Sequence, residues 1–219
     1  MGLALRPGIS FCDVGGRLVF LDIVADRYFC LDADIEEAFR RMMSADAAPT
    51  SLSTLLSRTG LLHDSNGPTC IRPFAPRSPA TDSLLDGPPT PCHPMRIVDT
   101  LIRLAIVRRA LRRGGFCRLV SQLTADKAKL QIDTARPTEA LRHIAIDFKR
   151  TRRLVRSHDQ CLARSLALAQ QCFWAGQRVD LVIGVRLRPF AAHSWVQAGS
   201  LLVNDQLETV RTYTPVLAL

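Results

Sequence analysis

Three short stretches near the start of the chain are rich in apolar and aromatic residues, over residues 9–12, 17–23 and 27–31. The breaks between these stretches contain Gly15-Gly16 and Ala25-Asp26. Short apolar runs bounded by turn-forming residues are typical of β-strands. The beginning of the chain therefore predicts three short strands.

Helical spacing follows the strands. Apolar residues recur at the helical period over residues 34–43 and 51–59, and Gly60 is a typical helix stop. Residues 1–67 therefore predict a small domain of strands followed by helices. Residues 68–94 contain eight of the thirteen prolines, so we expect a semi-rigid, extended linker there.

The remaining residues, 95–219, predict a second domain that begins with helices. Residues 95–113 and 138–154 show the helical period, residues 116–123 predict a short strand or a helix extension, and residues 124–137 predict a polar connection. The first helix is expected to pack its apolar residues on a core and to present a basic face to solvent. Its apolar residues are Ile97, Leu101, Leu104, Ile106 and Leu111, and its arginines are Arg103, Arg108, Arg109, Arg112 and Arg113.

Another helix is predicted to begin at Cys161 and to end near Gly176. Ser157 or Asp159 can cap its first turn, because a short polar side chain accepts a hydrogen bond from the N–H groups there. One helix face carries apolar residues at helical spacing, so it is expected to pack into a core and hold the cysteine still. These residues are Leu162, Leu166, Ala169 and Phe173.

Three strands follow that helix, over residues 179–186, 193–197 and 201–205. If residues 198–200 form a three-residue hairpin loop, His193 lies opposite Asp205 on one face of the sheet. A two-residue loop would instead place the carboxylate on the other face. If His193 and Asp205 act in the same site, the sequence therefore predicts the three-residue loop.

Cys161, His193 and Asp205 carry the groups of a thiol nucleophile, its base and the carboxylate that orients the base. A helix N-terminus favours the thiolate, because its unpaired N–H groups and dipole stabilise negative charge. Each residue also has an ordinary alternative: a small buried hydrophobe, a structural histidine and a turn residue. Their order on helix, strand and strand favours catalysis.

Two further features of this site stay open at the level of sequence. The backbone N–H of Cys161 is a natural oxyanion donor, whereas Gln160 and His158 are candidates for a second donor by adjacency alone. Trp195 can either wall a cleft or fill the core.

Four segments at these positions carry a specific resemblance: Cys161-Leu-Ala-Arg-Ser-Leu-Ala-Leu, Leu181-Val-Ile-Gly-Val-Arg, Pro189-Phe-Ala-Ala-His-Ser-Trp-Val and Val203-Asn-Asp. They resemble the transglutaminase-like cysteine protease that matures lasso peptides, the leader peptidase usually called the B protein. The resemblance spans about residues 150–210 and implies an α+β fold with a papain/transglutaminase-like peptidase domain. It implies Cys161 as nucleophile, His193 as general base and acid, and Asp205 as the orienting carboxylate.

The stretch Leu52-Ser-Thr-Leu-Leu-Ser-Arg-Thr-Gly-Leu-Leu is similar to the closing helix of winged-helix, PqqD-like precursor-recognition domains. In such domains a leader peptide adds as a strand to the third strand of the sheet and packs against the last helix. The chain thus resembles the fused form of a recognition unit and a peptidase. The alternative is that the chain's own helices cover this edge. The implied leader-binding residues are Arg27, Tyr28, Phe29, Cys30 and Leu31 on the strand, and Leu52, Leu55 and Leu56 on the helix.

The same resemblance implies two partners, a lasso precursor peptide and an ATP-dependent, asparagine-synthetase-like cyclase that closes the ring. We expect no cofactor of the chain's own, because it lacks a Gly-rich loop followed by Lys; any ATP requirement belongs to the cyclase. We expect no metal either, since Cys92-His93 lacks nearby ligands for a tetrahedral site. Acyl transfer to an amine by the same triad, and non-catalytic escort of the precursor, remain alternatives.

Composition and charge indicate the class of protein, its compartment and its partners. A chain of 219 residues that is 47% hydrophobic and 22% charged is typical of globular domains rather than disorder. Seven cysteines without a CxxC pair, no signal-peptide pattern and no apolar run long enough for a bilayer span predict a cytoplasmic protein. The net charge of +9 would suit nucleic acid, but the arginines concentrate in residues 103–156, outside the winged unit. We therefore do not expect nucleic-acid binding, and interpret the arginines as a solvated surface or a docking face for a peptide or protein.

Overall fold

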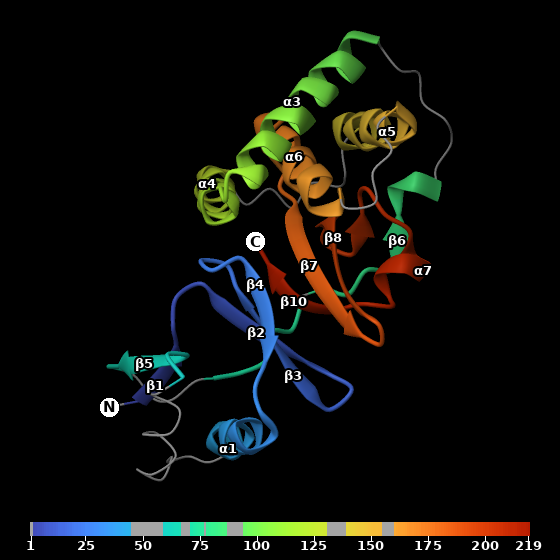
Figure 1. The fold of residues 1–219 in the computed structure, drawn as a ribbon. Helices are drawn as coiled ribbons and strands as arrows, with labels where there is room; N and C mark the ends of the chain where they lie inside the picture. Colours follow the sequence, from blue (N-terminus) through green and yellow to red (C-terminus); the bar gives the residue numbers. More distant parts are fainter. Residues whose placement is uncertain are drawn as a thin grey trace. The chain divides into compact units, whose positions relative to one another are not determined.

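The computed structural model describes residues 2–44, 59–66, 71–76, 78–86, 94–130, 139–154 and 160–219. The chain divides into two compact units, Met1–Ala75 and Pro76–Leu219 (Figure 1). Each unit has its own cluster of buried hydrophobic residues. The division falls inside the segment 68–94 that the sequence predicted as a linker.

The first unit contains the three strands that the sequence predicted. They are β2 (Ile9–Val14), β3 (Arg17–Asp22) and β4 (Arg27–Cys30), joined as an antiparallel sheet in the order β2-β3-β4. Gly15 and Gly16 turn the chain between the first two strands with φ values of 58° and 86°, a conformation that glycine adopts without strain. β4 is an edge strand within the described part of the chain.

Two elements of this unit differ from the prediction. β1 (Gly2–Leu5) and β5 (Leu62–Ser65) form a separate two-stranded antiparallel sheet. The sequence did not predict these strands, because four residues are too few to show a clear pattern. The helix α1 (Ala33–Ser44) agrees with the predicted helix over residues 34–43. The predicted helix over residues 51–59, including Leu52, Leu55 and Leu56, lies outside the described residues except for Thr59.

An aromatic cluster forms the core of the first unit. Phe11, Phe20 and Phe39 are each at most 1% exposed, and they pair by stacked and edge-on contacts at 5.2–5.4 Å. Phe29 of the edge strand stacks on Phe20 with ring centroids 5.2 Å apart. The inward side chain of β4 therefore anchors this strand to the sheet.

The second unit contains the helices α3 (Pro94–Arg112), α4 (Phe116–Lys129), α5 (Glu139–Leu154) and α6 (Cys161–Trp174). The polar connection predicted from residue 124 is wrong for residues 124–129, because α4 continues through them. Its buried residues, Phe116, Leu119, Val120 and Leu123, lie in the first two turns. These contacts hold the helix, and its polar last turns extend from them.

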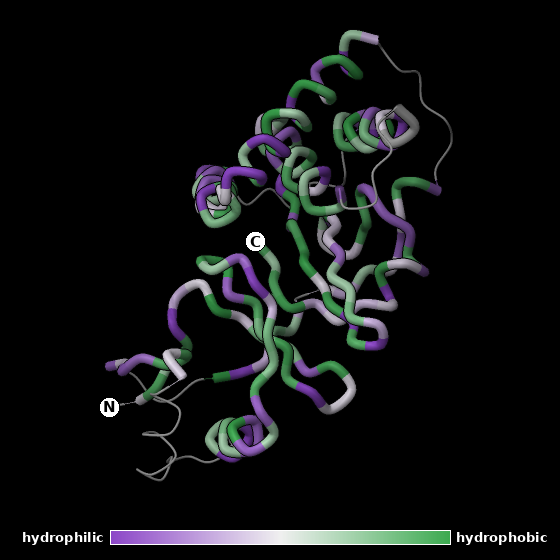
Figure 2. The backbone as a smooth tube through the Cα atoms, in the orientation of Figure 1, coloured by the Kyte–Doolittle hydropathy of each residue, from purple (hydrophilic) through white to green (hydrophobic). Residues whose placement is uncertain are grey.

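α3 packs largely through the face that the sequence predicted: Leu104 is buried, and Ile97, Leu101 and Leu111 are half-buried. Its buried residues are Thr100, Leu104 and Val107, whereas Ile106, expected in the core, is 62% exposed. Apolar residues occur on more than one side of this helix, so their spacing alone does not show that Ile106 is outside the packed face. Figure 2 shows hydrophobic and hydrophilic positions mixed along its length.

A five-stranded sheet completes the second unit, in the order β10-β7-β8-β9-β6. Its long central hairpin confirms two predicted strands, whereas the C-terminal strand and the edge strand were not predicted. The edge strand β6 and the short 3-10 turn after it belong to the proline-rich segment 68–94, so this part of the segment docks on the sheet instead of acting only as a spacer. The strands are β6 (Asp82–Ser83), β7 (Asp180–Leu187), β8 (Phe190–Ala198), β9 (Leu201–Leu202) and β10 (Thr214–Ala218), with the turn η1 (Leu84–Asp86) and the helix α7 (Leu207–Val210).

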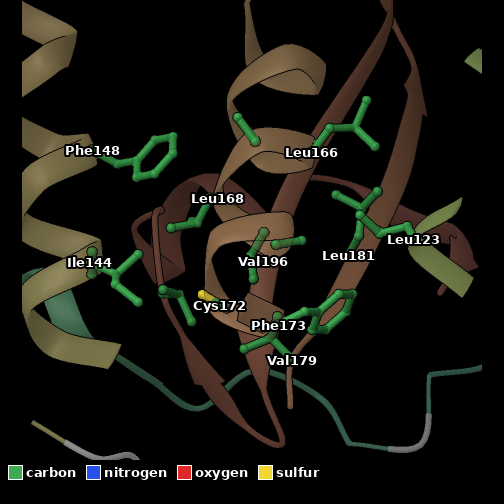
Figure 3. Close-up of a cluster of buried hydrophobic side chains, with 14 of the residues drawn as sticks. Leu123, Ile144, Phe148, Leu166, Leu168, Cys172, Phe173, Val179, Leu181 and Val196 are labelled. Carbon is green, nitrogen blue, oxygen red and sulfur yellow. The ribbon is translucent and has the colours of Figure 1, made fainter. Parts of the chain in front are cut away.

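α6 is the central helix of this unit. It contacts β7 and β8 on one side and the helices α3, α4 and α5 on its others. Figure 3 shows Leu166, Leu168 and Phe173 of α6 among Ile144 of α5 and Val196 of β8. The predicted apolar face of α6 is confirmed, since Leu166, Ala169 and Phe173 are buried. A helix held on all sides fixes the position of its first residue.

None of the helices in the described part of the chain is long and apolar enough to cross a bilayer.

Candidate active site

Cys161 is the first residue of α6, with its side chain half-buried. The residue at the N-cap is Gln160, which makes no side-chain cap hydrogen bond. Ser157 and Asp159, the predicted caps, lie outside the described part of the chain. The N–H groups and the dipole of the first turn favour negative charge on the cysteine sulfur.

His193 of β8 and Asp205 form the second part of the site. The imidazole Nε2 lies 2.5 Å from the carboxylate Oδ2, and both side chains are at least four-fifths buried. The other carboxylate oxygen, Oδ1, accepts a hydrogen bond from the N–H of Gln206 at 2.8 Å. The Ser83 hydroxyl donates to the Asp205 carbonyl at 2.7 Å. Asp205 is thus held at its backbone and at both oxygens.

The hairpin before Asp205 does not have the predicted register. Ala198 pairs with Leu201 and Gln197 with Leu202, so the loop is the two-residue Gly199-Ser200 and the predicted three-residue loop is wrong. Even so, His193 and Asp205 meet. A two-residue loop would place Asp205 on the other face only if the strand continued to residue 205. β9 ends at Leu202, so the alternation of faces does not extend to Asp205.

Asn204 explains how the strand is interrupted. The N–H of Val203 still donates to the Val196 carbonyl at 2.8 Å, as in a strand pair. The next acceptor is not a backbone carbonyl, because the N–H of Val196 donates to the Asn204 side-chain Oδ1 at 2.8 Å. The asparagine side chain thus takes the place of a backbone acceptor in the strand pairing. Asp205 is no longer part of a strand, and its side chain points toward His193.

Ser165 links the cysteine helix to the histidine strand, a role that sequence analysis missed. It lies one helical turn after Cys161 and is fully buried. Its hydroxyl donates to the Ser194 carbonyl at 2.9 Å and accepts from Asn204 Nδ2 at 3.1 Å. A serine on the buried face of an otherwise apolar helix was the available sequence signal, since a buried hydroxyl needs partners.

Electrostatics favour charge separation between Cys161 and His193. Burial tends to raise the pKa of the Cys161 thiol, but hydrogen bonding and charge from His193, together with hydrogen bonds from Ser194, bring that pKa below its ordinary value. Burial tends to lower the pKa of His193, but its contacts with Asp205 and Cys161 raise that pKa to about 9. Because Asp205 occupies Nε2, Nδ1 is the ring nitrogen left to the sulfur. Both shifts favour a thiolate on Cys161 beside an imidazolium on His193.

Two aromatic rings hold the imidazole. The Tyr213 ring centroid lies 5.1 Å and the Trp195 centroid 6.2 Å from that of His193. Trp195 is 1% exposed and its indole N–H donates to Gln197 Oε1 at 3.0 Å, so it fills the core rather than walling a cleft. Gly184, opposite His193 on β7, makes room for that ring: an added Cβ would lie 2.8 Å from the indole.

Gln160 is unusual among the polar residues near Cys161. Its side chain is buried, with 4% of the residue exposed, and neither amide Nε2 nor Oε1 has a hydrogen-bond partner in the described part of the chain. An orphaned buried amide is costly and calls for an explanation. The other candidate for a second oxyanion donor, His158, lies outside the described residues.

The residues proposed for leader binding belong to the first unit. β4 has β3 as its strand neighbour and an otherwise open edge among the described residues. Tyr28 and Phe29 are half-buried, Cys30 is exposed and Leu31 is buried. Arg27 is exposed and its guanidinium lies 5.4 Å from the Phe29 ring centroid. The helical part of this predicted site lies outside the described residues.

Comparison with known families decides the class of the second unit. Residues 101–218, more than half of the chain, match the family model described as the transglutaminase-like superfamily. The chain belongs to this superfamily. No curated protein and no solved structure gives a match. The superfamily match includes Cys161, His193 and Asp205, and therefore covers the whole cluster described above.

Within the described residues, no group of three or more His, Cys, Asp or Glu side chains has an arrangement that could hold a metal ion.

Proposed function

We propose that the chain is a cysteine peptidase that hydrolyses the bond between the leader and the core of a ribosomally synthesised lasso precursor. The observation that carries the proposal is the convergence of Cys161, His193 and Asp205, with a thiol pKa lowered by the histidine. The transglutaminase-like superfamily supplies the fold class. The choice of a lasso precursor is supported by the resemblance of the segments around these residues to lasso leader peptidases.

The reaction follows from the ion pair. The Cys161 thiolate attacks the scissile carbonyl carbon, and the resulting oxyanion collapses as the imidazolium of His193 gives its proton to the leaving amine. The core is released with a free amine, and the leader stays on the sulfur as a thioester. The neutral imidazole then takes a proton from water, whose oxygen attacks the thioester and frees the leader carboxylate and the thiolate. Asp205 fixes the ring orientation and stabilises its charge in both steps.

Two donors next to the sulfur are available for the oxyanion. The backbone N–H of Cys161 lies at the helix start, where it needs no intrahelical partner. We assign the second position to the Gln160 amide, which is adjacent and has no competing partner among the described residues. The developing negative oxygen would supply the hydrogen bond that this amide lacks.

Recognition of the leader is assigned to the first unit. An extended peptide can add to the open edge of β4 through backbone hydrogen bonds, beside Tyr28 and Phe29. Holding the leader on the same chain raises the effective concentration of the cleavage site at Cys161. Selectivity then does not require a deep specificity pocket at the thiol. On this proposal, Leu52, Leu55 and Leu56 complete the binding surface.

The released core amine suits a second enzyme. A freed N-terminal amine is the nucleophile for ring closure, and we propose that an ATP-dependent, asparagine-synthetase-like cyclase performs that step and consumes the ATP. The peptidase itself needs no cofactor for the two steps above. A reducing compartment such as the cytoplasm keeps the thiol available.

Acyl transfer is the second candidate, favoured by the superfamily match. The same thioester could be attacked by an amine in place of water. Incubating the precursor with the enzyme, with and without a primary amine, and measuring intact masses separates the two outcomes. Hydrolysis gives a leader with a free carboxylate under both conditions, whereas transfer gives a leader heavier by the amine less one water.

We expect a short reading frame beside this gene to encode the precursor for this experiment, with a leader and a core that begins with Gly. If the enzyme binds the leader but cleaves nothing, even with the cyclase added, the non-catalytic escort function replaces the proposal.

A further inference from the structure

α3 exposes a row of large apolar side chains. Met95, Val98, Ile102 and Ile106 are 76%, 53%, 54% and 62% exposed. Their spacing of three and four residues places them on one face of the helix. Single exposed apolar residues are normal on a protein surface, but a continuous row is typical of an interaction site.

This row lies on the opposite side of α3 from the core. Thr100, Leu104 and Val107 are the buried residues of the helix. At about 100° per residue, their mean direction differs from that of the exposed row by about 160–180°. The exposed row therefore cannot be a poorly packed margin of the core. It is a second apolar face, which we call the α3 stripe: Met95, Val98, Ile102 and Ile106.

Arginines occupy the C-terminal end of the same helix. Arg109 continues the α3 stripe at helical spacing, and Arg113 follows directly after the last turn. Together with Arg108, Arg112 and Ala105 they line a groove of about 490 Å³. Within the described residues none of these four arginines has an ion pair, whereas Arg103 on the same helix pairs with Asp99 at 2.7 Å.

A tight corner keeps these arginines together. Gly114 has a φ of 71°, and Gly115 donates its N–H to the Ala110 carbonyl at 3.0 Å. A Cβ on Gly115 would lie 2.7 Å from that carbonyl oxygen, so the close return of the chain depends on glycine. α4 begins immediately afterwards, and the basic end of α3 is fixed in place.

We propose that the α3 stripe and the adjoining arginines dock an amphipathic helix of a partner protein, which runs antiparallel to α3 and carries Asp or Glu in its first two turns. Apolar side chains of that helix would cover the stripe, as in other helix-in-groove complexes. Its acidic N-terminal turns would meet Arg109 and Arg113. Carboxylates are favourable both at a helix N-terminus and beside unpaired guanidinium groups.

The arrangement argues against three other occupants. A second copy of this chain would bring together two molecules that each carry a net charge of +9. A helix that lies on a membrane has basic residues along its polar face and commonly aromatic anchors, whereas these arginines gather at one end of a stripe without aromatics. Nucleic acid would use the arginines but would leave the apolar stripe uncovered.

A synthetic helical peptide tests the proposal on the full-length chain. The probe carries four Leu at the spacing of the α3 stripe and three Glu in its first two turns, with a fluorescent label for anisotropy. We expect saturable binding to the wild-type protein. We expect Ile102→Glu to weaken binding at least tenfold, with Val24→Glu, at a residue 64% exposed in the first unit, as the matched control.

Charge exchange identifies the orientation. Arg109→Glu/Arg113→Glu should lose binding of the acidic probe at least tenfold and gain binding of a probe whose three Glu are replaced by Lys. The control pair is Arg142→Glu/Arg211→Glu, which changes the same charge at two other exposed arginines of the second unit. Circular dichroism of each variant verifies that the fold is retained.

Five results would overturn the proposal. The wild type could fail to bind the probe, or bind it equally well after Ile102→Glu. The protein alone could sediment as a dimer that Ile102→Glu dissociates, which would assign the stripe to self-association. It could also co-sediment with phosphatidylserine vesicles, or bind duplex DNA, through the same residues more tightly than it binds the probe.

Discussion

Cys161 and Cys172 lie three turns apart on α6, and their surroundings shift their thiol pKa values in opposite directions. Burial raises the pKa of Cys172 to about 12, because this side chain is fully enclosed among apolar residues. At Cys161, by contrast, His193 more than offsets burial and lowers the pKa. Figure 3 shows the Cys172 sulfur inside the core. The imidazole beside the helix start therefore distinguishes a nucleophile from a packing residue.

This contrast predicts an unusual pH profile for alkylation. Iodoacetamide reacts with the thiolate, so an ordinary thiol becomes about tenfold slower for each pH unit below about 8.5. The rate at Cys161 should begin to fall only at a lower pH, because its lowered pKa maintains the thiolate there. Peptide mapping by mass spectrometry measures the rate at Cys161, with a cysteine-containing model peptide as reference. Parallel pH profiles for the two would contradict the ion pair.

Cleavage should instead decline on the alkaline side. The pKa of His193 is about 9, so the imidazolium that protonates the leaving amine is present below that pH and disappears above it. Asp205→Asn removes the carboxylate that helps raise this pKa and should move the alkaline limb of kcat/KM to lower pH. We also expect kcat to fall at least about 100-fold. Glu208→Gln, three residues away and exposed, is the matched control and should change neither quantity.

Ser165→Ala should reduce the stability of the second unit. The substitution leaves the Ser194 carbonyl without its hydroxyl donor and Asn204 Nδ2 without its acceptor, both in the interior. We expect a loss of about 1–3 kcal/mol in the free energy of unfolding, measured with urea. Ser121→Ala, at an exposed serine whose hydroxyl donates to the Cys117 carbonyl, should cost less than about 0.5 kcal/mol. Equal stabilities would show that the Ser165 bridge contributes little.

Gln160→Leu separates catalysis from folding. Leucine has a similar volume and removes a buried amide that lacks partners, so the free energy of unfolding should stay constant or increase. If the amide binds the oxyanion, kcat should nevertheless fall by about 100-fold. An active and equally stable variant would exclude this residue as the donor, and a destabilised one would show that the amide has a structural role.

The spacing of apolar residues was sufficient to predict the central helix and the central strands of the second unit. Cys161 opens a helix whose apolar face is buried, and His193 lies on the long strand after it. These elements have strong patterns because one helix face and one sheet face meet in a single core. β10 was missed although it pairs with β7, since Pro215 near its start weakens the strand pattern.

The position of Asp205 could not be obtained from strand alternation. That rule assumes that the ladder continues, whereas the Asn204 side chain takes the place of a backbone acceptor after Val203. A side chain that accepts a hydrogen bond in place of the backbone depends on tertiary structure, and the spacing of apolar residues in the sequence does not reveal it. α3 is a related case: with apolar residues on two opposite faces, only packing shows that Leu104 is buried and Ile106 is exposed.

The most direct test of the central claim compares the two cysteines of α6 in precursor cleavage. Cys161→Ala should abolish release of the core, followed by intact mass, while fluorescence anisotropy shows leader binding unchanged. Cys172→Ala leaves the proposed nucleophile in place and should retain cleavage at a temperature where the variant is folded. Full cleavage by Cys161→Ala, or loss of cleavage by a folded Cys172→Ala alone, would contradict the assignment.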